Sequence, residues 1–178
     1  MVDPIQELKT RAEILHHALR AREPGAIARL RALGELRRAT PEQLTAFLPD
    51  VQRKHTLAIV AREAGFDDWT HAHTILSGGT ASSFGTLLCP PNFSAHWNIW
   101  SAHYDEARSI RQEHGGYLLA YKQHFFIADR YYIEALGLDP EDPDWERIGR
   151  DWVRPLDTAA RSRLYGSLLA RHGQPPRS

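Results

Sequence analysis

The sequence contains one cysteine, Cys89, among 178 residues. A single cysteine excludes an internal disulfide framework and any zinc site built from several cysteine ligands. Long apolar runs are also missing, because no stretch approaches the ~20 residues needed to cross a bilayer. The first residues, MVDPIQELKTRAEIL, lack the basic and apolar regions of a signal peptide. We therefore expect a cytoplasmic protein that makes no membrane contact.

The chain also lacks an excess of charge of either sign, since 22 Lys and Arg residues balance 22 Asp and Glu residues. A neutral chain has no overall field that attracts nucleic acid or an anionic membrane. The distribution is uneven, with eight basic and five acidic residues in 1–40, and nine acidic residues and four arginines in 129–157. A nucleic-acid domain usually has a stronger basic stripe. We interpret both regions as solvated helix faces and do not favour a nucleic-acid partner. Nucleic-acid contact through the basic N-terminal helices is a third, weaker hypothesis.

Motifs of the common catalytic classes are absent as well. The chain has no GxGxxG, GxxxxGK[ST], HExxH or GxSxG pattern, which argues against the usual nucleotide sites, zincins and α/β-hydrolases. The acidic run DPEDPDWE lacks the glycine and the final glutamate spacing of an EF-hand loop. Its Asp-Pro steps indicate a turn that leads into a helix. The sequence assigns no cofactor and no catalytic residue.

What the first half does contain is a series of helix signals. Apolar residues recur with helical spacing over residues 5–19, and the pattern restarts with Pro24 in a first-turn position. The residues TPEQ at 40–43 predict a capping box at the start of a short helix. A fourth helix is expected over about 51–64.

The stretch REAGFDDWTHAH predicts a joint between two helices. Gly65 has the position of a left-handed helix end, Phe66 follows it, and Asp67 or Asp68 caps the next helix. The expected buried stripe of that helix consists of Trp69, Ala72, His73 and Leu76. His71 is expected to face outward.

This half resembles a known module. The residues LKTRAEILHHALRAREPGAIARLRAL and AIVAREAGFDDWTHAHTIL are similar to the helical module that precedes ankyrin repeats in some bacterial proteins. The similarity covers about residues 5–76, and its most specific part is the A-R-E-x-G-F-x-x-W pattern from Ala61 to Trp69. Ankyrin repeats themselves are absent, since there is no T-P-L-H-x-A and no 33-residue period. The resemblance implies a helical fold and a bacterial protein but no activity.

The second half has a different residue pattern, with short apolar and aromatic runs. Its segments GGYLLAY, ALGLDPEDPDW and IGRDWVRP resemble parts of uncharacterised bacterial proteins. We expect a strand at 84–89 and a helix of about twenty residues within 93–116. A further helix should end with Gly137 and Leu138 in a left-handed helix end. The next should start at Asp142 and extend to its last apolar residue, Trp152, before a final helix near the C-terminus. Residues 117–128 favour a hairpin over a helix, although periodicity alone leaves both open. The predicted fold is α+β and mainly helical. Its expected parts are a helical module at 1–76, a linker at 77–83, a unit with a small antiparallel sheet at 84–172, and a disordered tail at 173–178.

Several histidines stand near one another in the sequence and are candidate metal ligands. His71 and His73 stand two residues apart, so on a helix they point about 200° apart and cannot share an ion. His96 and His103 would lie about 10.5 Å apart along a helix, with only Ile99 and Trp100 between them at ligand spacing. His103 and Glu106 are spaced to supply two metal ligands from one helix, but no third ligand residue follows them at helical spacing. A site assembled from distant segments, for example with His124, stays open, and no metal ligand is assigned.

Cys89 is a candidate nucleophile, because it ends a predicted strand just before two prolines. It would need a neighbouring histidine such as His96, or a helix N-terminus, to form a thiolate. The alternative is a small buried hydrophobic residue. That alternative is favoured, because no family signature surrounds this cysteine.

A dense aromatic set over residues 93–132 predicts a core together with a ligand pocket or a partner surface. The candidate pocket residues are Cys89, His96, Trp100, His103, Tyr104 and His124. Our main expectation is an accessory protein that binds a small-molecule ligand, or a protein partner or second copy through residues 93–132. The alternative is a small-molecule enzyme or metal-binding protein with its pocket around residues 89–124.

Overall fold

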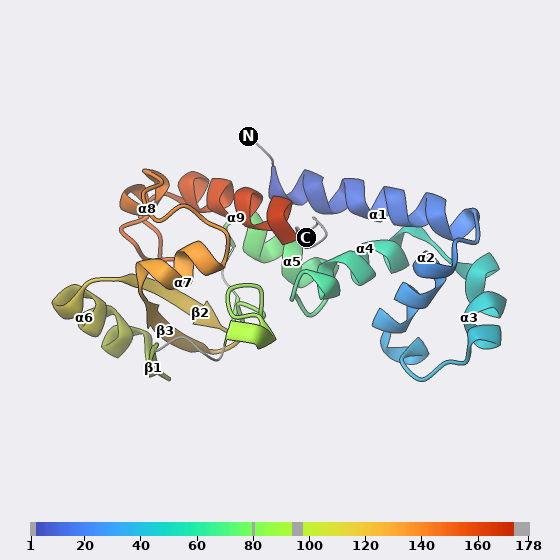
Figure 1. Cartoon of the computed structure of the whole chain (residues 1–178), viewed down its shortest axis with the longest axis horizontal. Helices are drawn as coiled ribbons and strands as arrows, with labels where there is room; N and C mark the ends of the chain where they lie inside the picture. Colours follow the sequence, from blue (N-terminus) through green and yellow to red (C-terminus); the bar gives the residue numbers. More distant parts are fainter. Residues whose placement is uncertain (1–2, 80, 94–97, 173–178) are drawn as a thin grey trace.

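The computed structural model describes residues 3–79, 81–93 and 98–172. It confirms an α+β fold that is mainly helical, with one small antiparallel sheet. Figure 1 shows the N-terminal helices at one end of the molecule and the sheet at the other. Helices α1 (Pro4–Arg20) and α9 (Thr158–His172) lie in contact along one side and connect the two ends.

The N-terminal half contains the helices that the sequence predicts. After α1 come α2 (Pro24–Arg29), α3 (Pro41–Phe47), α4 (Arg53–Glu63) and α5 (Trp69–Leu76), with 3-10 turns η1 (Leu30–Ala32), η2 (Gly34–Leu36) and η3 (Leu48–Asp50). Thr40 and Gln43 form the predicted capping box at the start of α3. Each of α1, α2 and α3 begins with a proline, whose missing N–H needs no partner in a first turn.

The joint between α4 and α5 is confirmed. Gly65 has φ +86° and its N–H donates to Arg62 O over 2.9 Å, while Phe66 N–H donates to Ala61 O over 3.0 Å. These two bonds are the Schellman pattern of a helix end. The Asp68 carboxylate then accepts a hydrogen bond from His71 N over 2.8 Å and begins α5.

The predicted orientation of the two histidines in this joint is wrong. The His71 side chain is only 12% exposed, whereas His73 is exposed. His71 Nδ1 accepts from Asp67 N over 3.0 Å, and Nε2 lies 2.7 Å from the Ser83 carbonyl oxygen. The segment around Ser83 therefore covers the face of α5 that the sequence pattern left to solvent.

The sheet has the strand order β1 (Ile99–Ser101), β3 (His124–Ala128), β2 (Tyr117–Tyr121), and both pairings are antiparallel. The β2–β3 pair is the predicted hairpin, with Leu119 opposite Phe126. Strands β2 and β3 consist mainly of apolar residues, because most of their side chains are buried under other parts of the protein. The hairpin prediction for residues 117–128 is confirmed.

The long helix predicted within residues 93–116 is wrong over its first part. Residues 99–101 form β1, and helix α6 (Tyr104–His114) begins only after it. Trp100 is opposite Phe126 on β3, and their rings stack with centroids 4.6 Å apart. This pairing across the sheet outweighs the local helical pattern. The Ser101 hydroxyl, which accepts from His103 N over 2.9 Å, marks the change from strand to helix.

Residues 84–89 do not form the predicted strand. Phe84 N–H donates to Lys122 O over 2.9 Å, and Lys122 N–H donates to Gly85 O over 2.8 Å. The chain therefore makes two backbone hydrogen bonds with the turn of the β2–β3 hairpin, but no strand. Gly85 then adopts φ +69°, and Thr86 N–H donates to Gly65 O over 2.8 Å instead. The chain leaves the sheet at Gly85 and packs on the α4–α5 joint.

The C-terminal segment contains α7 (Arg130–Ala135), a short α8 (Asp144–Arg147) and α9. The predicted helix end at Gly137 and Leu138 is confirmed by the Leu138 N–H bond to Ile133 O. Helix α8 ends well before the predicted position, because Trp152 N–H donates to Leu118 O over 2.9 Å. Residues 150–152 thus run along the outer edge of β2.

One hydrophobic cluster contains buried residues from both halves, from Leu8 on α1 to Leu169 on α9. Its largest rings form a continuous contact series from the sheet to the last helix: Tyr117, Trp145, Trp152 and Tyr165. The predicted boundary at 77–83 stays a prediction, and the tail at 173–178 lies outside the described residues. No helix in the described part of the chain has the length and apolar character needed to cross a membrane.

The buried carboxylate of Asp144 on α8 connects this helix to α9 through an ion pair with Arg163. Its side chain is 8% exposed, Arg163 Nε and Nη2 donate to it over 2.6 Å each, and Arg147 donates over 2.7 Å. The hydrogen bonds from Arg163, assisted by Arg147 and opposed by burial, hold the pKa of Asp144 below its usual range. A carboxyl with a lowered folded-state pKa stabilises the fold at neutral pH, and this stabilisation disappears as the pH falls through that pKa.

Replacing Asp144 with asparagine should lower the free energy of unfolding by about 2 kcal/mol at neutral pH, because the neutral amide loses its charge-assisted bonds. Urea unfolding of both proteins measures the difference at neutral and at strongly acidic pH. We expect the difference to shrink in acid, where the wild-type carboxyl becomes protonated. An equal difference at both pH values would show that the Asp144 charge is not involved.

Candidate functional site

Two adjoining pockets of about 420 and 320 Å³ lie on either side of a Tyr104–Arg154 pair, which belongs to both. We call them the arginine pockets. The larger one is lined further by Gly78, Gly79, Ala81, Phe84, Phe125, Val153, Pro155, Thr158 and Arg161. The smaller one is lined further by Arg108, Arg111, Gln112, Ile148, Gly149, Asp151 and Leu156. Ligand sites in proteins usually have volumes in this range.

Helix α6 supplies one wall of the smaller pocket. Tyr104, Arg108 and Arg111 are spaced at i, i+4 and i+7, which places them along one face of a helix. The neighbouring face of α6 contacts the sheet through buried Ala107, and Tyr104 is packed against the same cluster. The helix is therefore anchored beside the face that presents Arg108 and Arg111 to the pocket.

The loop between α8 and α9 supplies the other wall, and Asp151 holds it in place. Asp151 Oδ1 accepts from the backbone N–H groups of Val153 and Arg154, each over 2.9 Å. Asp151 Oδ2 accepts from the Tyr104 hydroxyl over 2.6 Å. One buried carboxylate thus fixes the turn that presents Arg154 and connects it to α6.

Tyr104 is a positioning group in this arrangement. Burial first, and then the hydrogen bond to Asp151, raise the pKa of Tyr104 to about 12. The hydroxyl therefore keeps its proton at neutral pH and continues to donate to Asp151. A phenol in this state is neither a nucleophile nor a base, and its ring instead supports the Arg154 guanidinium, 4.0 Å from the ring centroid.

Arg161 on α9 lies at the back of the larger pocket. It is only 5% exposed, and its Nη1 donates to the Trp152 carbonyl oxygen over 2.9 Å. Its partners among the described residues are backbone carbonyls, which orient the guanidinium without neutralising its charge. An unneutralised cation in a dry location favours an anion beside it.

The arginines of these pockets differ from most other arginines in the same half. Of the five others that the structure describes, all but Arg171 form an ion pair with a carboxylate: Arg130, Arg147, Arg150 and Arg163. Among the described residues no ion pair includes the four pocket arginines, namely Arg108, Arg111, Arg154 and Arg161. In addition, Arg111 Nε is buried and has no hydrogen-bond partner there.

The combined lining has four positive charges and one negative charge. The negative one, Asp151, already accepts three hydrogen bonds from the protein. The charged donors of the lining are therefore guanidinium N–H groups. Such groups bind carboxylate and phosphate oxygens, often in pairs of parallel hydrogen bonds.

The residues selected from the sequence lie in different places. Tyr104 lines both arginine pockets. Cys89 is half-buried next to Tyr132, and burial together with this cysteine raises the pKa of the tyrosine. Three others lie at the surface of the sheet region: Trp100 on β1, His103 before α6 and His124 on β3. His96 falls outside the described residues.

The aromatic set of residues 93–132 divides between core and surface. Phe126 and Tyr132 are fully buried, while Trp100 is 47% and Tyr131 66% exposed. A partner at this surface stays a prediction. In the described ranges no group of three or more His, Cys, Asp or Glu side chains is arranged to hold a metal ion.

The pocket arginines are not among the residues predicted from the sequence, because an arginine in a mixed-charge segment has no distinguishing pattern of the kind that histidine pairs or a lone cysteine have. One local signal was present, namely the Tyr104, Arg108, Arg111 spacing on a helix that should be amphipathic. Arg154 and Arg161 carry no such signal, since their approach to α6 depends on how the α8–α9 loop follows β2. Only the three-dimensional structure identifies arginines without carboxylate partners.

Comparisons with known proteins give the chain no relatives. No family model matches it, and neither a curated protein nor a solved structure shows significant similarity to it. The resemblance of residues 5–76 to the ankyrin-associated module stays a prediction.

Proposed function

We propose that this protein is a binding protein for a small anion that also carries an apolar group, and that the arginine pockets are its ligand site. The observation that carries the proposal is a set of four arginines around two adjoining pockets that form no ion pair with any described carboxylate. Unneutralised guanidinium groups close together repel one another and lose hydration. An anion relieves both costs, so the site favours an anionic occupant.

The anionic part of the ligand contacts the smaller pocket. Arg108 and Arg111 approach it from α6, and Arg154 approaches from the loop. The unpartnered Nε of Arg111 supplies one donor of a two-bond contact with a carboxylate or phosphate group. The stacking of Arg154 on Tyr104 limits the guanidinium to few orientations, which lowers the entropy cost of binding.

The apolar part contacts the larger pocket. Its walls include the rings of Phe84 and Phe125 and the side chain of Val153, with Arg161 at the back. A flat ring or a short hydrocarbon chain fits such walls, because its burial removes apolar area from water. Arg154 separates the two regions and contacts both parts of one ligand.

Thermal unfolding with phenyl phosphate and benzoate tests this proposal. A ligand that binds only the folded state raises the melting temperature, by roughly 2–4 °C per kcal/mol for a chain of this size. We expect both anions to stabilise the protein and neutral benzyl alcohol to have little effect. In the double variant R111A/R154A the affinity should fall about 100-fold or more, since two charge-assisted contacts are lost.

Each variant is compared with its own ligand-free melting temperature, so that a change in intrinsic stability does not count as a change in binding. The matched control is R130A, which removes an exposed arginine that has carboxylate partners outside the pockets. It should bind as the wild type does. Full anion stabilisation of R111A/R154A, or an equal effect of benzyl alcohol, contradicts the proposal.

A further inference from the structure

Arg161 is the only buried arginine in the part of the chain that the structure describes, with 5% of its surface exposed. It lies on α9 and belongs to the lining of the larger arginine pocket, so its remaining exposed surface opens into that pocket. A guanidinium group does not lose its proton inside a protein. A buried charge of this kind is favourable only when hydrogen bonds and an opposite charge surround it. Its partners therefore decide what the pocket binds.

The protein occupies only one nitrogen of this guanidinium. Arg161 Nη1 donates to the carbonyl oxygens of Trp152 and Val153, over 2.9 and 3.5 Å. Its Nε and Nη2 atoms have no hydrogen-bond partner among the described residues, and no described carboxylate forms an ion pair with it. The Nε–Nη2 edge of Arg161 thus has two parallel N–H groups to offer a ligand.

The same edge binds a carboxylate in two other arginines of this protein. Arg163 Nε and Nη2 donate to the two carboxylate oxygens of Asp144 over 2.6 Å each. Arg29 Nε and Nη2 donate to those of Glu63 over 2.8 and 2.6 Å. The spacing of the two N–H groups matches that of the two oxygens of a carboxylate. Arg161 has this geometry, but no carboxylate of the described chain fills it.

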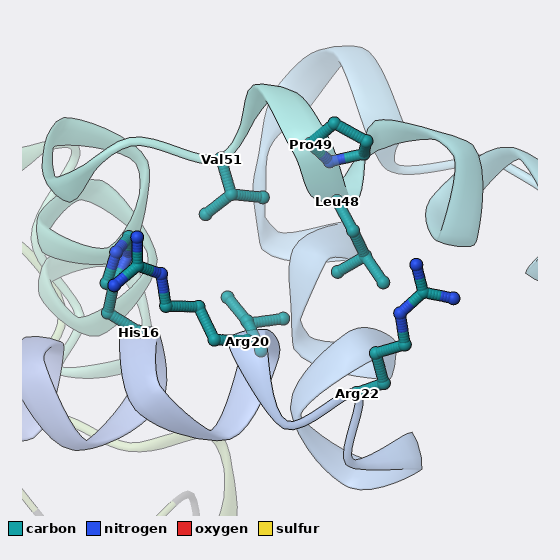
Figure 2. A pocket seen from close by; sticks show the side chains of 7 residues that line it. His16, Arg20, Arg22, Leu48, Pro49 and Val51 are labelled. Atoms are coloured by element: carbon teal, nitrogen blue, oxygen red, sulfur yellow. The ribbon is translucent and has the colours of Figure 1, made fainter.

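Burial distinguishes Arg161 from the arginines of a third pocket, which has a volume of about 260 Å³ and lies near the end of α1. Figure 2 shows the guanidinium groups of Arg20 and Arg22 pointing away from each other, with Leu48 between them. Both arginines are exposed, so water solvates their charges. That pocket therefore implies no anion, whereas the buried guanidinium of Arg161 does.

We infer that the ligand of the arginine pockets carries a second acidic group, a carboxylate, which binds the Nε–Nη2 edge of Arg161. The inference rests on the proposed function, in which the first anionic group contacts the smaller pocket. Tyr104 and Arg154 stand between the two pockets, and the rings of Phe84 and Phe125 line the larger one. The apolar part of the ligand therefore separates its two charges, and the substrate class is a dianion with an apolar centre.

Isothermal titration calorimetry with aryl phosphates tests the inference. The compounds are 3- and 4-carboxyphenyl phosphate, and the two methylphenyl phosphates in which a methyl group replaces the carboxylate. We expect at least one carboxyphenyl phosphate to bind the wild type about tenfold or more tightly than its methyl counterpart, because it gains a pair of charge-assisted hydrogen bonds.

The variant R161Q assigns this preference to Arg161. Its amide still has a donor for the Trp152 carbonyl oxygen but carries no charge. The ratio of the two affinities should therefore fall to about one, because the carboxylate loses its ionic partner. A ratio within one protein is independent of any general loss of affinity. The control R130Q removes an arginine outside the pockets and should keep the wild-type ratio.

A second readout needs no variant. In a proton–nitrogen NMR spectrum of the wild type, the Arg161 Nε–Hε signal should shift with the preferred carboxyphenyl phosphate and much less with its methyl counterpart. Equal affinities for carboxyphenyl and methylphenyl phosphates overturn the inference and leave the proposed function in place. A preference that persists in R161Q, or an Arg161 signal that ignores the carboxylate, also overturns it. If none of the compounds binds, the proposed function is wrong and the inference with it.

Discussion

Replacing Gly85 with alanine should cost about 3 kcal/mol or more of unfolding free energy. Gly85 has φ +69°, and a Cβ atom at this position would lie 2.3 Å from the Gly65 carbonyl oxygen. The strain has two sources, namely a left-handed backbone that alanine disfavours and an overlap with main-chain atoms that cannot rotate away. Urea unfolding measures the loss.

This contact matters because it attaches residues 84–88 to the α4–α5 joint. Gly65 O accepts from Thr86 N over 2.8 Å, so the two backbones approach closely where both residues are glycine. The control is Gly25→Ala, since no atom lies within 4 Å of its added Cβ, and the helix should become more stable by up to about 1 kcal/mol. Equal stability changes at positions 85 and 25 would refute the close packing described for this joint.

Replacing Trp152 with alanine should lower the free energy of unfolding by about 3–5 kcal/mol, as expected for truncation of a fully buried tryptophan. Trp152 has no exposed surface, and its ring lies 5.4 Å from that of Trp145 and 4.8 Å from that of Tyr165. Its removal leaves a cavity between the α8 segment and α9 that these large rings cannot close. Chemical unfolding at neutral pH measures the change.

The same substitution should also weaken anion binding, because Trp152 follows Asp151 and its carbonyl oxygen accepts from Arg161. Tyr131→Ala is the control, since that ring is 66% exposed and its loss should change stability by less than about 0.5 kcal/mol. Equal free energies of unfolding in Trp152→Ala and Tyr131→Ala would contradict the continuous contact series of buried aromatic rings.

Features that depend on neighbours in sequence were predictable. The capping box at Thr40, the helix ends at Gly65 and Gly137, and the hairpin at residues 117–128 each rest on interactions within a few residues. Backbone hydrogen bonds and glycine conformation largely determine such features, whatever the rest of the chain does. The general α+β architecture followed from them.

Features that depend on distant partners were not predictable. Residues 99–101 form a strand because Trp100 stacks on Phe126, and residues 84–89 leave the sheet because Thr86 binds Gly65. His71 is covered by Ser83, twelve residues away. The same reason explains the arginine pockets, since Arg154 meets α6 only after the chain has passed through β2, β3 and two helices.

The arginine Nε–Hε signals in a proton–nitrogen NMR spectrum test the proposed ligand site most directly. Arg111 Nε is the key reporter, because it is buried and has no hydrogen-bond partner in the described part of the chain. On titration with phenyl phosphate, we predict that the Arg111 and Arg154 signals shift together with one dissociation constant, while the ion-paired Arg130 signal stays in place. Unchanged Arg111 and Arg154 signals at saturating phenyl phosphate would contradict the proposed site.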